Sequence, residues 1–329
     1  MKLKGKAHKY GANVDTDVII SGSLRAKYLI IKRKLKMAEF IAWNSQPLDE
    51  WAKKYAQGKF IDLDGYSTHY IEKGEGDPVI LIHGFFYDSY MWNKNIDALA
   101  KKFKVYALDL FGFGYSTREP MDYGYPLYAD QLLKFMDALN IQRASLVGQS
   151  MGGGTSILFC VQHRERVNKL ILVDAAGLPN PIPLLGKIAN LPKVGEFAYG
   201  LKTNFVRKTT LKTTFIDKHF ITDDYFENAT RFHKIKGTTE VLLKILHKQF
   251  FNTLPSETHR LGEMDVPILI VWGRQDKAIP VARGQQMHEI LKTSRLEFFD
   301  RAGHCPHDEQ SEKFNQIAVD FLSQIEGAK

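Results

Sequence analysis

A Gly-x-Ser-x-Gly motif at Gly148–Gly152 places a serine where it can act as a nucleophile. An apolar segment at residues 144–147 precedes the motif, and a helical pattern over residues 151–163 follows it. Glycines on either side of Ser150 are needed because larger side chains would clash in so tight a strand-to-helix turn. The turn presents the Ser150 hydroxyl group beside a helix N-terminus, so the motif predicts attack on a carbonyl carbon.

A serine hydroxyl group is a weak nucleophile and needs a general base. We expect His304 to be this base, because it follows a glycine in the loop after the predicted strand at residues 296–299. His307 lies three residues further on and competes for the role. The glycine before His304 suits a loop that must approach the serine closely, so His304 is preferred.

An acid must orient the base. We expect Asp276 to do so, because it lies just past the predicted strand at residues 268–271. Asp174 directly follows the strand at residues 170–173 and is the alternative acid. Both aspartates therefore follow strands of the same predicted sheet.

The negative charge that develops on the attacked carbonyl oxygen needs preorganised N–H donors. The N–H of Met151, directly after the nucleophile, is one expected donor, and the N–H of Phe85 is the second, with Phe86 next in order. His83 begins the same loop, and we expect it to shape that loop rather than to take part in catalysis. Phe86 and Trp92 are candidate walls of the substrate pocket.

From about residue 60 to residue 325, the chain resembles the α/β-hydrolase superfamily with a helical cap. The resemblance implies a catalytic triad of Ser150, Asp276 and His304, in the chain order that this fold uses. It also implies that Asp109 is structural. The motifs that match are His83-Gly84-Phe85, Asp109-Leu-Phe-Gly112-Phe-Gly114-Tyr-Ser116, Gly148-Gln-Ser150-Met-Gly152, Gly273-Arg-Gln-Asp276 and Gly303-His304-Cys-Pro-His.

The resemblance also separates relatives within the superfamily. Haloalkane dehalogenases and epoxide hydrolases resemble the chain overall, but they have an aspartate where this chain has Ser150. Both are therefore disfavoured. Cofactor-free oxygenases and perhydrolases of the superfamily keep the serine and remain alternatives.

The elements that must position these residues alternate between strand and helix, which predicts an α/β fold with a doubly wound, mostly parallel sheet. The alternation stops after about residue 177 and resumes near residue 256. An insertion of about 80 residues is too long for a loop, so we expect a helical cap over residues 178–255. Residues 46–177 and 256–329 would then form the hydrolase core. The predicted strands are residues 60–63, 69–72, 78–82, 105–108, 144–147, 170–173, 268–271 and 296–299, and the predicted helices are residues 92–101, 125–139, 151–163, 281–291 and 309–325.

Charge and composition narrow the class of protein. The 329 residues are 44% hydrophobic and 25% charged, which is typical of a globular protein. Residues 1–36 contain ten Lys or Arg and two Asp, so they account for the whole net charge of +8. A nucleic-acid-binding domain would concentrate basic residues on its folded body, so we expect no nucleic-acid partner. Two cysteines provide neither a disulfide framework nor a Cys-rich metal site, and no metal or cofactor is expected.

The first 45 residues form a basic leader with two parts. Residues 5–20 resemble the N-terminus of the small subunit of 3-isopropylmalate dehydratase, and the resemblance ends at Ser21. Residues 24–43 repeat apolar side chains at helical spacing among basic ones. They predict an amphipathic helix that either contacts an anionic membrane surface or packs on the body. The expected location is cytoplasmic, with membrane-surface association as an option.

The preferred functional hypothesis is a serine hydrolase of carboxylic esters with an apolar acyl or aromatic group. Ser150 would form the acyl-enzyme, and His304 would protonate the leaving alcohol and then activate water. A small-molecule ester is therefore the expected partner. The sequence does not determine the oligomeric state.

Two further hypotheses stay open. The Gly-x-Ser-Met-Gly motif with a helical cap is similar to the hydrolases that cleave carbon–carbon bonds in aromatic ring-fission products. Those enzymes usually carry a glycine-rich oxyanion loop, where this chain has Phe85-Phe86-Tyr87. A binding module on the same scaffold is the non-catalytic alternative, and the presence of Ser150, Asp276 and His304 argues against it.

Overall fold

A computed structural model describes residues 40–180, 187, 191, 193–201 and 203–324 of the chain. The chain divides into two compact units, residues 1–42 and 43–329, and the fold below is that of the second unit. The stretch at residues 5–20 and most of the predicted helix at residues 24–43 lie outside the described residues. Residues 40–43, the end of that prediction, are not helical.

One eight-stranded sheet forms the core of the second unit, in the order β1-β2-β4-β3-β5-β6-β7-β8. The first two strands pair antiparallel with each other, β2 pairs antiparallel with β4, and all later neighbours are parallel. This confirms the predicted mostly parallel sheet. The strands are β1 Lys59–Leu63, β2 Tyr66–Lys73, β3 Pro78–Ile82, β4 Lys104–Leu108, β5 Ala144–Gln149, β6 Val167–Val173, β7 Ile268–Gly273 and β8 Arg295–Phe299.

The central strands are buried along nearly their whole length. All six residues of β5 and all six of β7 are buried, as are four of the five in β3. Continuous apolar runs such as Val79–Ile82 suit these strands because helices cover both of their faces. Apolar burial on both faces holds the carboxyl ends of the strands in register.

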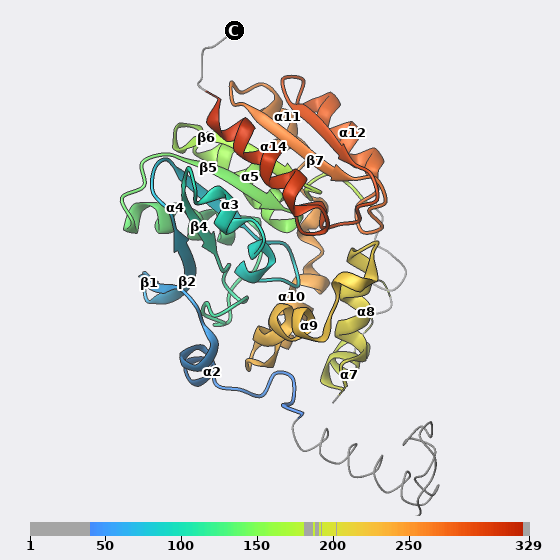
Figure 1. Cartoon of the computed structure of the whole chain (residues 1–329). Coiled ribbons are helices and arrows are strands. Elements are labelled where there is room, and N and C mark those ends of the chain that lie inside the picture. Colours follow the sequence, from blue (N-terminus) through green and yellow to red (C-terminus); the bar gives the residue numbers. More distant parts are fainter. Residues whose placement is uncertain (1–39, 181–186, 188–190, 192, 202, 325–329) are drawn as a thin grey trace, which may run out of the picture. The chain divides into compact units, whose positions relative to one another are not determined.

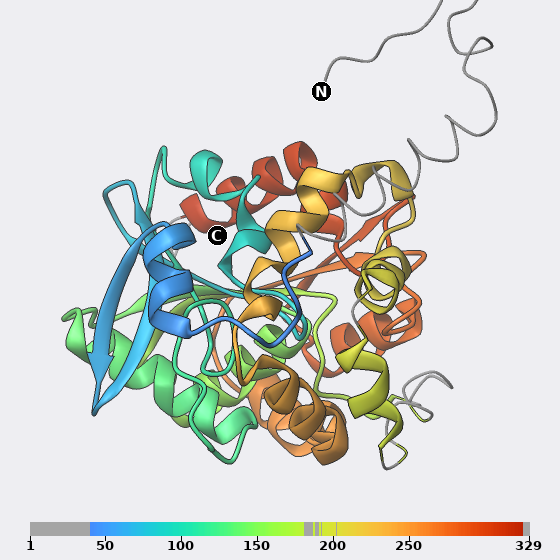
Figure 2. The ribbon, with the colours of Figure 1, turned by 90° about the horizontal axis from the view of Figure 1, so that it is seen from below.

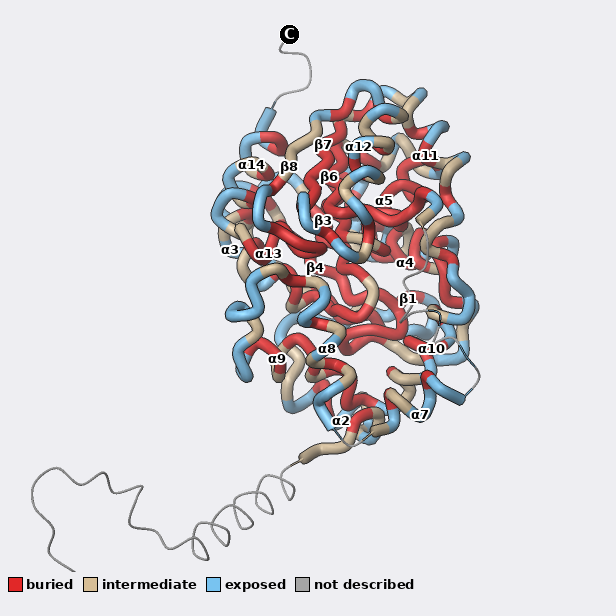
Figure 3. Tube along the Cα trace, turned by 90° about the vertical axis from the view of Figure 1, so that its right-hand side faces the viewer, coloured by how far each residue is buried: buried red, intermediate tan, exposed pale blue. Residues whose placement is uncertain are grey.

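Helices cover the two faces of the sheet, as the view along its edge shows (Figure 3). Helices α4, α5, α11 and α12 contact one another in succession on one face, and α3 contacts α14 on the other. The prediction of one helix over residues 92–101 is wrong, because a 3₁₀ turn at Ser89–Trp92 precedes the short helix α3. These helices are α2 Leu48–Tyr55, α3 Ile96–Leu99, α4 Tyr125–Ala138, α5 Met151–Gln162, α11 Pro255–Gly262, α12 Val281–Ile290, α13 Pro306–Glu309 and α14 Ser311–Ser323.

The segment between β6 and α11 contains four α-helices and no strand within its described residues. It comprises α7 Val194–Gly200, α8 Phe205–Thr214, α9 Asp223–Thr230 and α10 Thr238–Lys248, with short 3₁₀ turns between them. Figure 1 shows these helices in yellow and orange below the sheet, and Figure 2 views them from below. We call this segment the cap. The chain thus has an α/β core with helices inserted between two strands, and the cap supplies one wall of the site described next.

Candidate active site

Ser150 lies in the tight turn between β5 and α5 and has a strained backbone. Its φ of 50° and ψ of −114° lie in a region that residues with side chains rarely adopt. A Cβ atom on Gly148 would come within 2.4 Å of the Gly152 carbonyl oxygen, and one on Gly152 within 2.2 Å of the Ile82 carbonyl oxygen. The flanking glycines are therefore required by close backbone packing.

His304 and Asp276 form a direct hydrogen-bonded pair. The Nδ1 atom of His304 lies 2.7 Å from Oδ2 of Asp276, and both side chains are buried. The other carboxylate oxygen, Oδ1, accepts hydrogen bonds from the amides of Ala278 at 2.7 Å and Ile279 at 3.1 Å. The carboxylate is thereby held in one orientation, so it can hold the imidazole in one tautomer.

Two residues that the sequence did not single out hold the backbone of His304. Its N–H donates to the Thr214 carbonyl oxygen at 2.8 Å. Its carbonyl oxygen accepts from the side-chain amide of Gln149 at 2.7 Å. Gln149 directly precedes Ser150 in the Gly-x-Ser-x-Gly motif, so the sequence could have marked it as a candidate site residue. Thr214 belongs to the cap and had no such signal.

Ser150 and His304 open into the same cavity, which has a volume of about 300 Å³. The loop after β3 contributes Phe85, Phe86 and Tyr87 to its wall. Most of the remaining lining is apolar or uncharged, and among the described residues His304 is the one lining side chain that can be cationic. The other lining residues are Ala176, Asn180, Thr210, Leu211, Thr213, Thr214, Leu246, Gln249, Phe251, Asn252, Ala278 and Ile279.

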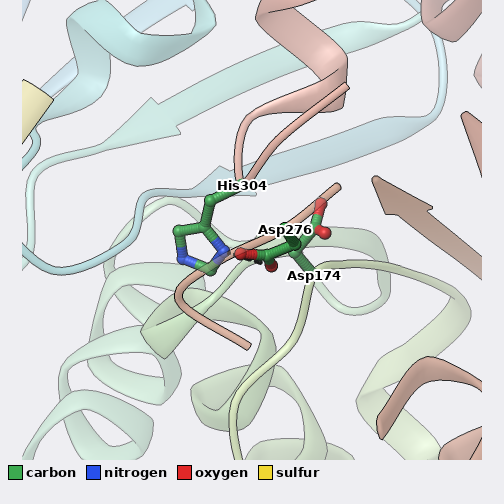
Figure 4. A group of neighbouring side chains, drawn as sticks. All are labelled: Asp174, Asp276 and His304. Carbon is green, nitrogen blue, oxygen red and sulfur yellow. Dashed lines mark hydrogen bonds and ion pairs between the residues drawn. The ribbon is translucent and has the colours of Figure 1, made fainter. Parts of the chain in front are cut away.

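Asp174 lies beside the His304–Asp276 pair, as Figure 4 shows, but its carboxyl group has a different environment. Its Oδ1 accepts from the Gly273 amide at 3.0 Å, while Oδ2 is buried without a partner. Burial, and next the neighbouring Asp276, raise the pKa of Asp174 well above its ordinary value. Burial therefore favours the protonated form of Asp174, and Asp276 is the aspartate whose side-chain oxygen faces His304.

Asp174, Asp276 and His304 each offer one potential metal ligand, and these three atoms lie within 4.8 Å of one another. The donor set fits a hydrogen-bond chain better than a metal site. Oδ2 of Asp276 and Nδ1 of His304 already bind each other, and burial raises the pKa of Asp174, which favours its protonated form. A cation here would have to break the 2.7 Å bond and remove a proton.

The predicted oxyanion donors lie at the start of α5 and in the loop after β3. Within the described part of the chain, neither the Met151 amide nor the Phe85 amide donates to a backbone carbonyl group. Phe86 adopts a φ of 75°, and its carbonyl oxygen accepts from Nε2 of His233 at 3.1 Å. This bond fixes the turn that follows Phe85, and Phe85 lines the same cavity as Ser150.

His83 and Asp109 have structural partners. Nδ1 of His83 bonds the Gly84 carbonyl oxygen at 2.8 Å, and its Nε2 accepts from the Leu110 amide at 3.0 Å. Asp109 accepts from the Ser89 and Tyr115 amides and pairs with His69 at 2.6 Å. Both residues are fully buried. They organise the loops beside the cavity.

Trp92 does not take the place expected of it. The structure buries it completely, with its ring centroid 4.5 Å from that of His307 and 6.3 Å from that of Phe314. It is absent from the cavity lining. The 3₁₀ turn that ends at Trp92 directs the side chain into the core under α13 and α14. His307, packed against it, is likewise kept from Asp276, and burial lowers the pKa of His307 to about 3.

The sheet, the strained serine and the buried His–Asp pair define a hydrolase of the α/β class, with a serine as the candidate nucleophile. The chain belongs to the α/β hydrolase family: the family model described as alpha/beta hydrolase fold matches residues 77–311.

Several known hydrolases are similar to the chain. The 2-hydroxy-6-oxo-6-phenylhexa-2,4-dienoate hydrolase of Comamonas testosteroni is 32% identical over 82% of this chain and 96% of its own length. The solved meta-cleavage product hydrolase of Pseudomonas fluorescens is 29% identical with a TM-score of 0.72, covering 80% of this chain and 97% of that one. A thermophilic esterase from Thermogutta terrifontis, 24% identical with a TM-score of 0.69 over 80% of this chain and 98% of its own, shares the fold.

Proposed function

We propose that the chain is a serine hydrolase that cleaves the carbon–carbon bond next to the ketone of a ring-fission product. The observation that supports this most strongly is the 32% identity, over 96% of its length, to a hydrolase of a 2-hydroxy-6-oxo-dienoate. The site contributes the serine, the His304–Asp276 pair and a mostly apolar cavity. These are the groups that acyl transfer requires.

In the proposed reaction, Ser150 attacks the ketone carbon while His304 accepts its proton. The amides of Phe85 and Met151 stabilise the oxyanion. Cleavage requires that the 2-hydroxydiene has first tautomerised to its 2-keto form, which moves the hydroxyl proton to the carbon next to the attacked ketone. The carbon–carbon bond then breaks, and its electron pair leaves as an enolate conjugated with this second ketone. Protonated His304 returns the proton to this carbon. Water, activated by His304, hydrolyses the acyl-enzyme and releases the carboxylic acid.

The cavity determines which acyl group can be accepted. The rings of Phe85 and Phe251 lie 5.4 Å apart, and both residues line the cavity, as do Leu211 and Leu246. Burial of an aromatic or alkyl group against these side chains is favourable because it removes apolar surface from water. The acyl part of the substrate is therefore apolar.

Carboxylic ester hydrolysis is the second candidate, and one observation favours it. Within the described residues, the cavity wall has no Lys or Arg. A dienoate would bring a carboxylate into an apolar cavity, and an unpaired buried charge is costly. A neutral ester avoids this cost, and the same serine, histidine and oxyanion donors would cleave it.

One panel of substrates separates the two candidates. It contains p-nitrophenyl esters from acetate to palmitate and 2-hydroxy-6-oxo-6-phenylhexa-2,4-dienoate, each tested with wild type and Ser150→Ala. We expect serine-dependent loss of the dienoate absorbance. Turnover of the esters alone would assign the second candidate. If no substrate turns over, while a fluorophosphonate still labels wild type but not Ser150→Ala, both bond assignments fail and only a reactive serine is left.

A further inference from the structure

Within the described part of residues 191–205, the cap exposes four large apolar side chains to solvent. Phe197 on α7 is 72% exposed and Phe205 on α8 is 73% exposed. Figure 1 labels both helices. Leu191 is 52% exposed and Val194 is 37% exposed. We call these four residues the α7–α8 apolar patch. Two phenylalanines exposed to this degree are costly in water unless another surface covers them.

The internal packing of the two helices explains why these side chains point outward. Nη1 of Arg207 donates to the Tyr199 carbonyl oxygen at 3.2 Å, and its guanidinium carbon lies 5.4 Å from the Tyr199 ring. Both residues are buried, so they mark the inner faces of α8 and α7. Phe197 and Phe205 each lie two residues before these anchors. Two residues correspond to about 200° around a helix, so both phenylalanines are on the outer faces.

The charge around the patch indicates what covers it. Residues 187–220 contain seven Lys or Arg and two Asp or Glu, although Arg207 is buried and Lys208 pairs with Asp223. Lys193 and Lys212 are exposed and form no ion pair within the described part of the chain. A second copy of the same face would bring these positive charges together, which opposes a symmetric dimer. An anionic lipid surface attracts them, at about 1 kcal/mol for each Lys or Arg near the headgroups.

We propose that the α7–α8 apolar patch docks on an anionic phospholipid membrane. Phe197 and Phe205 enter the interface between headgroups and acyl chains, and the neighbouring lysines contact the lipid phosphates. Helix α8 also lines the active-site cavity through Thr210, Leu211 and Thr213. The docked face is therefore on the same helix that walls the site. This proposal concerns binding and does not depend on which bond the enzyme cleaves.

Co-sedimentation of the full chain with vesicles tests the proposal. The vesicles contain phosphatidylcholine with phosphatidylglycerol, or phosphatidylcholine alone. We expect binding to the anionic vesicles, weakened by salt. Phe197→Ser combined with Phe205→Ser should lower the partition coefficient by about tenfold or more. The matched control is Phe60→Ser, which removes a 49% exposed phenylalanine from β1, outside the cap, and should leave binding unchanged.

A second measurement reports on the position of the patch itself. The chain has two cysteines, Cys160 and Cys305, and both are buried, so a cysteine introduced at Phe205 is labelled selectively by an environment-sensitive fluorophore. We expect a blue shift on addition of anionic vesicles. Unchanged vesicle binding by the double serine variant would overturn the proposal and move the contact to another part of the chain. A blue shift that follows protein concentration without lipid would also overturn it and assign self-association.

Discussion

The hydroxyl group of Tyr87 lies 2.9 Å from Oγ1 of Thr214, so the loop after β3 is bonded directly to the last residue of cap helix α8. The backbone of Thr214 also accepts the hydrogen bond from the His304 N–H at 2.8 Å. One cap residue thus contacts both the loop that carries Phe85, a proposed oxyanion donor, and the loop that carries His304, the proposed base. The position of the cap is therefore part of the geometry of the site.

The first prediction concerns this link. Tyr87→Phe removes the hydroxyl group but keeps the ring, so it should lower the free energy of unfolding by about 1 kcal/mol. It should also lower kcat/KM by about tenfold, because small displacements of catalytic groups are costly in rate. The measurement is a double-mutant cycle with Thr214→Val. Strictly additive effects would contradict the link, and Tyr90→Phe, which is outside the cavity, is the matched control.

The second prediction separates the two aspartates. Asp276→Asn should lower kcat by about 10⁴-fold, because an amide favours the wrong tautomer of His304. Asp174→Asn should lower it far less, because Asp174 does not face His304 and an asparagine oxygen can still accept from the Gly273 amide. The measurement is kcat on whichever substrate the panel identifies. A loss with Asp174→Asn as large as that with Asp276→Asn would exclude the assignment of Asp276.

The third prediction is a dependence of stability on pH. An aspartate in the unfolded chain has a pKa of about 3.9, and burial raises the pKa of Asp174 in the folded state. Above pH 3.9, the unfolded state therefore gains stability by releasing a proton that the folded state keeps. The folded state loses up to about 1.4 kcal/mol per pH unit until the pH reaches the folded pKa.

Asp174→Asn removes this titration, and asparagine tolerates the φ of 41° at this position. The Tm of the variant relative to wild type should therefore rise as the pH increases from 4 toward 7. Thermal unfolding of both proteins across this range is the measurement. A difference in Tm that stays constant with pH would contradict a raised pKa.

The fourth prediction concerns Trp92. Trp92→Ala should destabilise the fold by about 3–5 kcal/mol, because it removes a fully buried ring against His307 and Phe314. It should leave KM unchanged, since Trp92 does not line the cavity. Phe251→Ala is the matched comparison, because Phe251 does line it and the variant should change KM. A change in acyl preference with Trp92→Ala would place this side chain at the substrate after all.

The sequence alone determined those features that depend on short-range chemistry. The turn around Ser150 needs Gly148 and Gly152, because a Cβ atom on either residue would lie within 2.4 Å of a backbone carbonyl oxygen. The continuous apolar strands likewise indicated a parallel sheet covered on both faces. These signals are local, so residue types and spacing were sufficient to recognise them, and the central strands and the long core helices follow.

Only the tertiary structure distinguished residues that had the same type and a similar place in the predicted fold. Asp174 and Asp276 both follow strands of the sheet. Burial raises the pKa of Asp174, whereas Asp276 accepts hydrogen bonds from the amides of Ala278 and Ile279 and faces His304. Trp92 and the cap residue Thr214 were also placed by contacts between segments far apart in the chain. These positions depend on packing between segments that are far apart in the sequence. The spacing of residues within one segment therefore does not predict them.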